Sequence, residues 1–293
     1  MLNKPVVSII IPTFNREKQL ARCIDSLFKQ TEKKWEAIIV DNSKNHKTKL
    51  LIDMIADSRV RYVKVDNKGV IALSRNVGAA EAKADFLAFL DDDDWWTPNK
   101  LKYSLDRLAH GNDIVYHDMY YRSSKKIHWP FIFKSRDLDY KNPYKDLLLH
   151  GNGLVTSSVV LKKELFILVG GMTEAPELIA AEDYDCWLNL AKLNFKFSRI
   201  AKPLGFYWKG LNTSSVQRIP KILHKIRQLH DYKNESKSFY IYSLGRAYFL
   251  SHKYKQATKC FENLFRVEKR RVIILIKAFV MLSYIFIWNF LHG

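Results

Sequence analysis

The N-terminal part of the chain alternates between apolar runs and segments of helical periodicity, and this alternation restricts the fold more than any other feature. Short apolar runs predict four buried strands, at Val6–Ile11, Trp35–Val40, Arg61–Val65 and Phe86–Leu90. The segments between them have helical spacing, most clearly Glu17–Gln30. Strands that alternate with helices form a mostly parallel sheet, because each connection crosses over through a helix. The sequence therefore predicts an α/β fold, with a mostly parallel central sheet and helices on both faces.

Four consecutive carboxylates, Asp91 to Asp94, directly follow the fourth predicted strand. Ligands of open α/β sheets bind outside the carboxyl ends of the strands. Carboxylates at this density repel one another unless a cation lies among them, and their oxygens suit hard ions such as Mg²⁺ or Mn²⁺. The run therefore predicts a metal site that holds a phosphorylated substrate. The alternative is a solvated acidic turn before a helix that Thr97 caps and Pro98 begins.

Two common phosphate-binding motifs are missing from the sequence. No G-x-G-x-x-G run follows the first predicted strand, and the chain has no Walker lysine motif. A nucleotidyltransferase would need a glycine-rich, basic first loop, and the predicted turn Pro12–Arg16 is not one. The predicted site is therefore neither a dinucleotide site nor a P-loop.

Length and composition allow one large domain with an appendage, or two small domains. The chain has 293 residues, of which 47% are hydrophobic and 27% are charged, as in ordinary globular proteins. Its three cysteines lie far apart and form no C-x-x-C pair, which argues against a disulfide framework or a zinc site and fits a reducing cytosol. The first apolar run is too short for a signal peptide. We therefore expect a cytoplasmic protein in which Cys23 packs in the core.

The middle of the chain continues the sheet. Further strands are predicted at Asp113–Arg122, Thr156–Leu161, Phe195–Ile200 and Leu204–Trp208. A helix is predicted from Glu182-Asp183 onward. Residues 123–150 are aromatic and basic without a clear period, which is typical of a long loop over a site.

Positive charge is concentrated in the C-terminal part. The whole chain has a formal net charge of +18, and residues 218–271 contain 14 Lys and Arg against 4 Asp and Glu. Such a block is typical of contact with nucleic acid, of contact with anionic lipid, or of a solvated face. The runs Leu244–Tyr248 and Tyr254–Phe261 match half of a tetratricopeptide pattern, and one such unit cannot form a solenoid. We therefore expect a basic helical extension over 216–293 that contains a helical hairpin.

Residues 272–291 form an apolar terminal helix with Lys277 as its only formal charge, behind the basic run Lys269–Arg271. The helix is long enough to span a bilayer, with Lys277 extending to the interface. Trp288 and the basic flank suit a membrane interface. The alternative is a buried terminal helix. We favour membrane contact, and a helix that lies in the interface over one that spans the bilayer.

Several short motifs occur in one order along residues 5–215. They are Ser-Ile-Ile-Ile-Pro-Thr-Phe-Asn-Arg at 8–16, Val-Asp-Asn-Ser at 40–43, Ser-Arg-Asn-Val-Gly at 74–78, Phe-Leu-Asp-Asp-Asp-Asp at 89–94, Gly-Gly-Met at 170–172 and Glu-Asp-Tyr-Asp at 182–185. Together they resemble the family-2 glycosyltransferases of the type that builds bacterial surface polysaccharide and lipopolysaccharide. The resemblance implies a Rossmann-like GT-A fold over residues 1–215. It also implies inverting transfer of a sugar from a nucleotide diphosphate sugar, with Mn²⁺ or Mg²⁺ as cofactor.

The resemblance assigns the donor site residue by residue. Asp91 and Asp93 match the outer members of the D-x-D motif, with Asp93 as the direct metal ligand and Asp91 nearer the ribose. Asp41 would accept a hydrogen bond from a ring N–H of uracil or guanine, so UDP- and GDP-sugars both stay open. The other residues implied in nucleotide-sugar binding are Pro12, Thr13, Asn15, Arg16, Arg75, Asn76 and Asp92.

Asp183 matches the catalytic carboxylate of the family. A sugar hydroxyl is a poor nucleophile, so a base must take its proton while it attacks C1 from the face opposite the leaving group. The alternative for Asp183 is an N-cap of the helix that follows. Glu182 would place the base or meet the acceptor, and Trp187 is expected in the core.

The chain departs from the family after its last predicted strand. Many relatives have a histidine there that reaches the metal or the diphosphate, whereas residues 207–212 (Tyr-Trp-Lys-Gly-Leu-Asn) contain none. We expect Lys209 to supply the positive charge instead.

The resulting hypothesis is an inverting, metal-dependent enzyme that extends a glycan acceptor, lipid-linked, at the inner face of the plasma membrane. Residues 218–293 would attach it peripherally to anionic lipid, with a single C-terminal span as the alternative. One rival is a basic nucleic-acid-binding protein, but the chain lacks a recognised module and interleaved aromatic residues, so we expect no nucleic-acid partner. Another is a catalytically inactive glycan-binding relative, against which the set Asp91, Asp93 and Asp183 argues.

Overall fold

The computed structural model describes residues 4–123, 131–209, 216–231 and 235–292. It divides into two compact units. The first, here called the sheet unit, comprises Met1–Tyr144 and Asn152–Leu211. The second, the helical unit, comprises Lys145–Gly151 and Asn212–Gly293.

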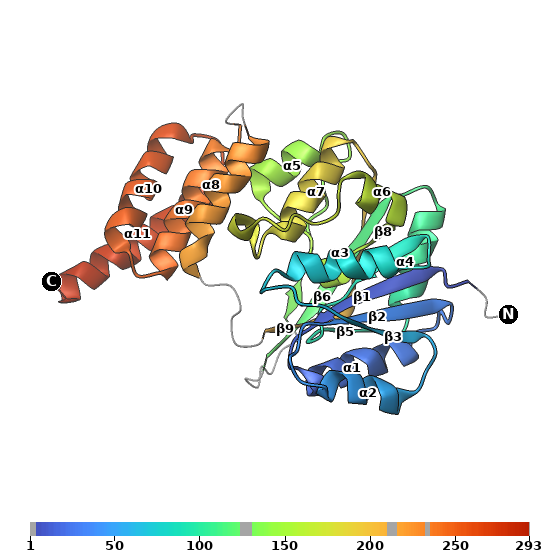
Figure 1. Ribbon diagram of the computed structural model, residues 1–293. Coiled ribbons are helices and arrows are strands. Elements are labelled where there is room, and N and C mark those ends of the chain that lie inside the picture. The colour runs from blue at the N-terminus through green and yellow to red at the C-terminus, as the bar shows by residue number, and fades with distance from the viewer. Residues whose placement is uncertain (1–3, 124–130, 210–215, 232–234, 293) are drawn as a thin grey trace. The chain divides into compact units, whose positions relative to one another are not determined.

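The sheet unit contains a nine-stranded sheet and the helices that cover it (Figure 1). The strands are β1 Val7–Thr13, β2 Trp35–Asp41, β3 Val60–Lys64, β4 Phe86–Phe89, β5 Trp95–Trp96, β6 Ile114–Ser123, β7 Ile132–Phe133, β8 Val160–Lys162 and β9 Phe197–Lys209. The helices are α1 Glu17–Phe28, α2 Lys47–Ile55, α3 Ile71–Glu81, α4 Lys100–Ala109, α6 Lys163–Leu168 and α7 Glu182–Lys192, with 3₁₀ turns η1 Thr156–Ser158 and η2 Pro176–Leu178.

The strand order is β3-β2-β1-β4-β8-β6-β9-β5, with β7 paired to β6. The strands β1 to β4 pair in parallel, as the sequence predicts. The second half of the sheet is mixed, because β8 runs antiparallel to both β4 and β6 while β6 and β9 are parallel. The short strands β5 and β7 also pair antiparallel. The α/β class is confirmed, and the parallel character is strongest in the N-terminal half.

Both faces of the sheet are covered, and β1 shows how the sequence achieves this. Side chains alternate between faces along a strand, so Val7, Ile9 and Ile11 pack in one core cluster with residues of α1, α2 and α4. Ile10 points to the opposite face, toward Gly78 of α3. Helix α3 covers that face of the sheet (Figure 1). Gly78 lets α3 approach closely there, because a Cβ at this position would lie 2.5 Å from Cγ2 of Ile10.

Three expectations about element boundaries are wrong. Residues 156–158 form the turn η1, so the strand expected at Thr156–Leu161 is reduced to β8. The two strands expected between 195 and 208 are one strand, β9, which keeps its pairing with β6 through two register shifts. Helix α4 begins at Lys100, and the Thr97 hydroxyl donates instead to the Leu204 carbonyl at 3.1 Å.

The predicted long loop is also partly wrong. Residues 143–150 form helix α5, and 132–133 form β7, whereas 124–130 lie outside the described residues. Residues 145–151 belong to the helical unit although sheet-unit residues precede and follow them. Arg271 donates to the Leu149 carbonyl at 2.9 Å, and Lys145 pairs with Glu235 at 3.0 Å.

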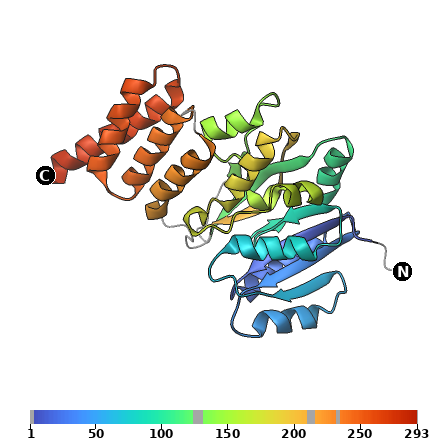
Figure 2. The ribbon, with the colours of Figure 1, turned by 45° about the horizontal axis from the view of Figure 1, so that its top comes forward.

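The remaining helices of the helical unit are α8 Ile219–His230, α9 Lys237–Leu250, α10 Tyr254–Val267 and α11 Val272–His292, after the 3₁₀ turn η3 Val216–Arg218. Helices α9, α10 and α11 run side by side (Figures 1 and 2). Their shared core contains Ile241, Phe261, Leu264, Ala278 and Ile285. The predicted hairpin of α9 and α10 is confirmed. Within the described residues, α11 is the one helix long and apolar enough to cross a membrane.

Candidate active site

The carboxyl ends of β1, β2 and β4 meet at one edge of the sheet. Thr13 at the end of β1 lies opposite Asp41 at the end of β2. The Leu90 amide, which follows β4, donates to the Ile10 carbonyl at 3.1 Å, and this brings the acidic run beside β1. Pro12 and Thr13 are the last residues of β1 and not part of a turn. The site is therefore assembled where ligands of α/β sheets bind.

Arginines offset much of the repulsion in the acidic run. The Arg16 guanidinium donates to Asp92 at 3.0 Å and to Asp93 at 2.9 Å. Thr13 donates its hydroxyl to the second oxygen of Asp92 at 2.7 Å. The protein's own side chains thus offset part of the repulsion among these carboxylates, the repulsion from which the sequence predicts a bound cation. Arg16, predicted to hold the nucleotide, is here an ion-pair partner of the carboxylates.

Asp92 and Asp94 are buried and hold the loop in place. Burial raises the pKa of Asp92 to about 6, and the neighbouring Arg16 counteracts part of this effect. Asp94 accepts the backbone N–H of Trp208 at 2.8 Å, and burial raises its pKa well above the ordinary value. Asp92, predicted to bind the donor, therefore anchors the loop to β1, and Asp94 joins it to the end of β9.

Asp91 and Asp93 retain oxygens for a metal. Oδ1 of Asp91 accepts from Arg75 at 2.8 Å, and Oδ2 of Asp93 accepts from Arg16. The other carboxylate oxygen of each accepts no hydrogen bond from another residue in the part of the chain that the structure describes, although the Asp93 carboxylate also interacts with its own backbone N–H. That part holds no cluster of three or more His, Cys, Asp or Glu fit for a metal. Two carboxylates suit Mg²⁺ or Mn²⁺, which take their remaining ligands from substrate phosphates and water.

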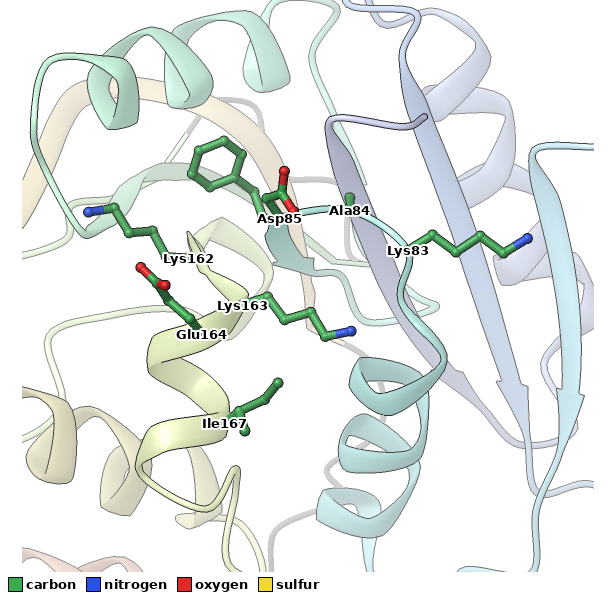
Figure 3. Close-up of a pocket in the computed structure, with 8 residues that line it drawn as sticks. Lys83, Ala84, Asp85, Lys162, Lys163, Glu164 and Ile167 are labelled. Carbon is green, nitrogen blue, oxygen red and sulfur yellow. The ribbon is translucent and has the colours of Figure 1, made fainter. Parts of the chain in front are cut away.

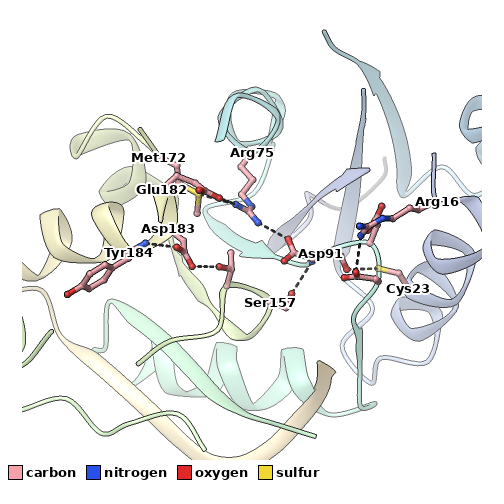
Figure 4. Close-up of polar contacts among 12 residues, drawn as sticks. Arg16, Cys23, Arg75, Asp91, Ser157, Met172, Glu182, Asp183 and Tyr184 are labelled. Atoms are coloured by element: carbon pink, nitrogen blue, oxygen red, sulfur yellow. Dashed lines mark hydrogen bonds and ion pairs between the residues drawn. The ribbon is translucent and has the colours of Figure 1, made fainter. Parts of the chain in front are cut away.

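Arg75 joins the acidic run to the start of α7 (Figure 4). Its buried guanidinium donates to Asp91 at 2.8 Å and to Glu182 at 2.7 Å. The two carboxylates raise the pKa of Arg75 although burial opposes this, so the side chain stays charged. Arg75 is predicted to bind the nucleotide sugar, but in this structure it links the D-x-D motif to the neighbour of Asp183.

Asp183 lies in the first turn of α7, and the N-cap of that helix is Ala181. Its Oδ2 accepts the Thr156 hydroxyl at 2.7 Å and the Asn152 amide at 3.2 Å. Its Oδ1 accepts the backbone N–H of Tyr184 at 2.7 Å (Figure 4). Burial and the adjacent carboxylate of Glu182 raise the pKa of Asp183 to about 6. A carboxylate with this pKa is ionised at neutral pH and is more basic than an ordinary aspartate.

Two of the predicted donor residues are held by the protein. Asp41 is fully buried and accepts the Ser43 amide at 2.8 Å and the Tyr62 hydroxyl at 2.9 Å. Asn76 donates to the Met172 carbonyl at 2.8 Å and accepts the amide of Met172 at 2.9 Å. Asn76 therefore fixes the Gly-Gly-Met turn, and both carboxylate oxygens of Asp41 already accept a hydrogen bond from the protein.

The last predicted donor and acceptor residues lie at the ends of loops and strands. Asn15 has a left-handed backbone with φ 53°, and its backbone N–H donates to the Ser43 hydroxyl at 2.8 Å. Lys209 is exposed at the end of β9, one residue after the amide that binds Asp94. Residues 210–212, which complete the segment without a histidine, lie outside the described residues.

Sequence reasoning missed the residues that support the two carboxylate groups. Besides Thr156 and Asn152, Ser157 accepts the Asp91 amide at 3.0 Å through its hydroxyl and the Trp96 indole N–H at 2.8 Å through its carbonyl. Consecutive polar residues, Thr-Ser-Ser at 156–158, were the available signal, because a buried strand would not contain them.

A hollow of about 490 Å³ lies at the other end of β4 (Figure 3). Two of its three lysines have partners: Lys162 pairs with Asp113 at 2.6 Å, and Lys163 donates to the Ala82 carbonyl at 2.7 Å. It lies at the amino end of β4, away from the edge that carries the acidic run. The hollow is therefore separate from the site described above.

Comparison with known proteins agrees with this geometry. The family model described as glycosyl transferase family 2 matches residues 8–166. One relative is the UDP-Glc:alpha-D-GlcNAc-diphosphoundecaprenol beta-1,3-glucosyltransferase WfgD of Escherichia coli, which is 28% identical over 190 residues, or 64% of this chain and 71% of WfgD.

Two solved structures share the fold. TarS 1-349 of S. aureus in complex with UDP-GlcNAc has a TM-score of 0.62 at 18% identity, over 95% of this chain and 88% of that one. The mannosyltransferase PcManGT from Pyrobaculum calidifontis, in complex with GDP-Man and Mn²⁺, has a TM-score of 0.61 at 14% identity, over 96% of this chain and 81% of that one. These likenesses establish the GT-A fold predicted from the sequence.

Proposed function

Because the chain belongs to glycosyl transferase family 2, we propose that it transfers a sugar, with inversion, from a nucleotide diphosphate sugar to a hydroxyl group of a glycan acceptor. One observation carries the proposal: a carboxylate with a raised pKa, Asp183, lies in the same polar network as the D-x-D motif. Arg75 and Glu182 connect the two. A donor site and a base held in one network can act on the two reactants of a single transfer.

Asp91 and Asp93 are the residues that would hold a divalent metal, each with one oxygen left for it. A bound Mg²⁺ or Mn²⁺ supplies positive charge that offsets the negative charge on the departing nucleotide diphosphate. Arg16 and Arg75 orient the two carboxylates, since each arginine donates to one of them. We expect Asp93 to be the direct ligand and Asp91 to lie nearer the ribose.

Asp183 acts as the general base. It takes the proton of the acceptor hydroxyl while the hydroxyl oxygen forms a bond to C1 of the donor sugar. The bond from C1 to the phosphate oxygen breaks, and its electron pair leaves with the nucleotide diphosphate. Attack from the opposite face inverts C1. Thr156 and Asn152 orient the base through Oδ2.

The partners follow from the site and from the relatives. The donor is a UDP- or GDP-sugar, since the names of the similar proteins include both nucleotides. The acceptor is a lipid-linked glycan of a surface polysaccharide, as the name of WfgD indicates for that enzyme. Lys209, at the end of β9, contributes positive charge to the diphosphate. The enzyme works on the cytoplasmic side of the membrane, where nucleotide sugars are available.

Nucleotide release from a panel of UDP- and GDP-sugars tests the proposal. Purified protein is expected to hydrolyse one donor slowly with Mn²⁺ or Mg²⁺ and to stop in EDTA. Lys49→Ala is a surface control, because it breaks an exposed ion pair of Lys49 with Asp53 on α2. This variant should hydrolyse the donor normally. No hydrolysis, together with no detectable binding of UDP, GDP or Mn²⁺, would contradict the proposal and favour an inactive glycan-binding relative.

A further inference from the structure

Helix α11 exposes a broad apolar surface. Its exposed residues include Ile273, Ile276, Val280, Phe286, Ile287 and Phe290. Ile273, Ile276, Val280 and Ile287 recur at three-, four- and seven-residue spacing, so they lie along one side of the helix. Phe290 has 82% and Phe286 has 75% of its surface exposed. Large apolar side chains gathered in this way mark a contact surface and not ordinary solvated helix.

The opposite side of α11 is packed. Ala278 and Ile285 are buried in the core that α11 shares with α9 and α10. Their seven-residue spacing places them on one side, away from Ile276 and Ile287. A helix that crossed a bilayer would have to leave this core and expose Ile241 and Phe261. The length of α11 alone does not distinguish a helix that lies along a membrane surface from one that spans the bilayer. Its packing against α9 and α10 favours the helix that lies along the surface.

Basic and aromatic residues border the apolar side. A groove of about 620 Å³ runs between α10 and α11, and its lining includes Lys255, Lys259 and Trp288 together with one carboxylate, Glu262. The Trp288 ring lies 6.0 Å from that of Tyr254, centroid to centroid. Ammonium groups beside a tryptophan at the edge of an apolar surface suit phosphate headgroups at the level of a membrane interface.

We propose that α11 lies in the plane of an anionic lipid bilayer, with its exposed apolar side among the upper acyl chains and lipid phosphates in the α10–α11 groove. The occupant is lipid and not a second copy of the chain, because residues 218–271 contain 14 Lys and Arg against 4 Asp and Glu. Two such surfaces repel each other, whereas an anionic bilayer attracts them. The inference deepens the proposed function by naming the membrane surface, but it does not depend on catalysis.

Sedimentation of the full chain with lipid vesicles tests the inference. The protein is expected to bind vesicles of phosphatidylcholine with phosphatidylglycerol, and to bind pure phosphatidylcholine at least about tenfold more weakly. Added salt should weaken binding, since it screens the charges. The double variant Ile276→Glu/Ile287→Glu changes exposed side chains only and is expected to remove binding. Met54→Glu, at an exposed position of α2, is the matched control and should bind as wild type does.

The charge contribution has its own test. Lys255→Glu/Lys259→Glu is expected to weaken binding to anionic vesicles by about 25-fold or more, at about fivefold per lysine, without changing the weak binding to neutral ones. Equal loss on both kinds of vesicle would contradict a phosphate-binding groove. Retention of bound protein in alkaline carbonate would contradict the in-plane arrangement, because a helix lying in the interface is released.

Two further outcomes would overturn the inference. One is a soluble wild-type protein that forms a dimer through α11 and does not bind vesicles. That outcome would show that a second copy of the chain covers the apolar side of α11. The other is unchanged vesicle binding by Ile276→Glu/Ile287→Glu. Donor hydrolysis separates this question from the proposed function: that variant should hydrolyse donor normally, and Asp93→Asn should bind vesicles normally.

Discussion

Asp183 is suited to its proposed role by the side chains around it. Burial and Glu182 raise its pKa to about 6, whereas the Thr156 hydroxyl and Arg75 lower it. The base is active when ionised, so the rate of transfer should rise with pH, change slope near pH 6 and level off above it. Below pH 6 each unit of pH should cost about tenfold in rate.

Thr156→Val is expected to move that profile. The substitution removes the hydroxyl that donates to Asp183 at 2.7 Å, so the pKa of Asp183 rises and the inflection moves to higher pH. The pH dependence of kcat measures the shift. Thr13→Val is the control, since it removes the corresponding bond to Asp92, whose pKa is also about 6. An inflection that moves in Thr13→Val but not in Thr156→Val would assign it to Asp92.

Arg75→Lys tests the link between donor site and base. Lysine keeps the charge but cannot donate to Asp91 and Glu182 in the same fork geometry. We expect kcat/KM for transfer to fall by about tenfold or more, with KM for the donor raised.

Arg199→Lys is the matched control, because Arg199 also bridges two carboxylates, Asp118 and Asp137, on a different part of the sheet. It should lower the melting temperature without changing KM for the donor. Similar donor kinetics in both variants would contradict a positioning role for Arg75.

At the scale of elements, α3 lies close to β1 and β2. This position of the helix determines which groups the Arg75 guanidinium can contact. Gly78→Ala would normally stabilise a helix by up to about 1 kcal/mol. Here the added Cβ would lie 2.5 Å from Ile10 and 3.0 Å from Val40, and overpacking of this kind costs about 1–3 kcal/mol. We therefore expect a net loss of stability in denaturant unfolding. In the Gly78→Ala background, Ile10→Ala should cost less than it does in the wild type, and equal costs would contradict the steric reason.

The sequence predicted some of these elements and missed others. The run Phe86–Leu90, which contains β4, was identified because no polar residue interrupts it, and β1 and β2 were identified because their apolar runs are interrupted only by Ser8 and Glu36. The D-x-D motif and Asp183 were placed by motif order, and the structure brings both into one network. The partners of these residues were not predicted, since Thr156 and Ser157 meet them through long-range packing of η1. Helix α5 was not predicted because residues 143–150 lack a clear helical periodicity. Contacts within the helical unit stabilise this segment, among them the hydrogen bond from Arg271 to the Leu149 carbonyl.

At the scale of the whole molecule, the chain passes from the helical unit back to the sheet unit between residues 151 and 152. Residues 145–151 belong to the helical unit, and the next residue, Asn152, donates to Asp183 at 3.2 Å. Gly151 has φ 78°, and a Cβ there would lie 2.5 Å from the ring of Phe239. The backbone conformation of Gly151 and its contact with Phe239 of the same unit therefore leave no room for a side chain at this position.

Gly151→Ala is expected to cost about 1 kcal/mol for its left-handed backbone and a further 1–3 kcal/mol for the contact with Phe239. Transfer should fall more than donor hydrolysis, since Asn152 supports the base and not the donor. Gly111→Ala is the matched control, because Gly111 has φ 82° and nothing within 4 Å of the added Cβ. Equal melting temperatures and equal transfer rates in the two variants would contradict the importance of Gly151 for the position of Asn152.

The most direct test of the central claim compares Asp183→Asn with Asp93→Asn. Once the donor panel has identified the nucleotide, its metal-dependent affinity and the rate of transfer to acceptor are measured for both variants. Asp183→Asn should keep donor affinity and lose about 10²–10⁴-fold in transfer. It should also melt no lower than wild type at neutral pH, because the raised pKa means that ionised Asp183 costs stability there. Asp93→Asn should lose donor affinity. Transfer that survives in Asp183→Asn, or donor affinity that survives in Asp93→Asn, would contradict the assignment of base and metal ligand.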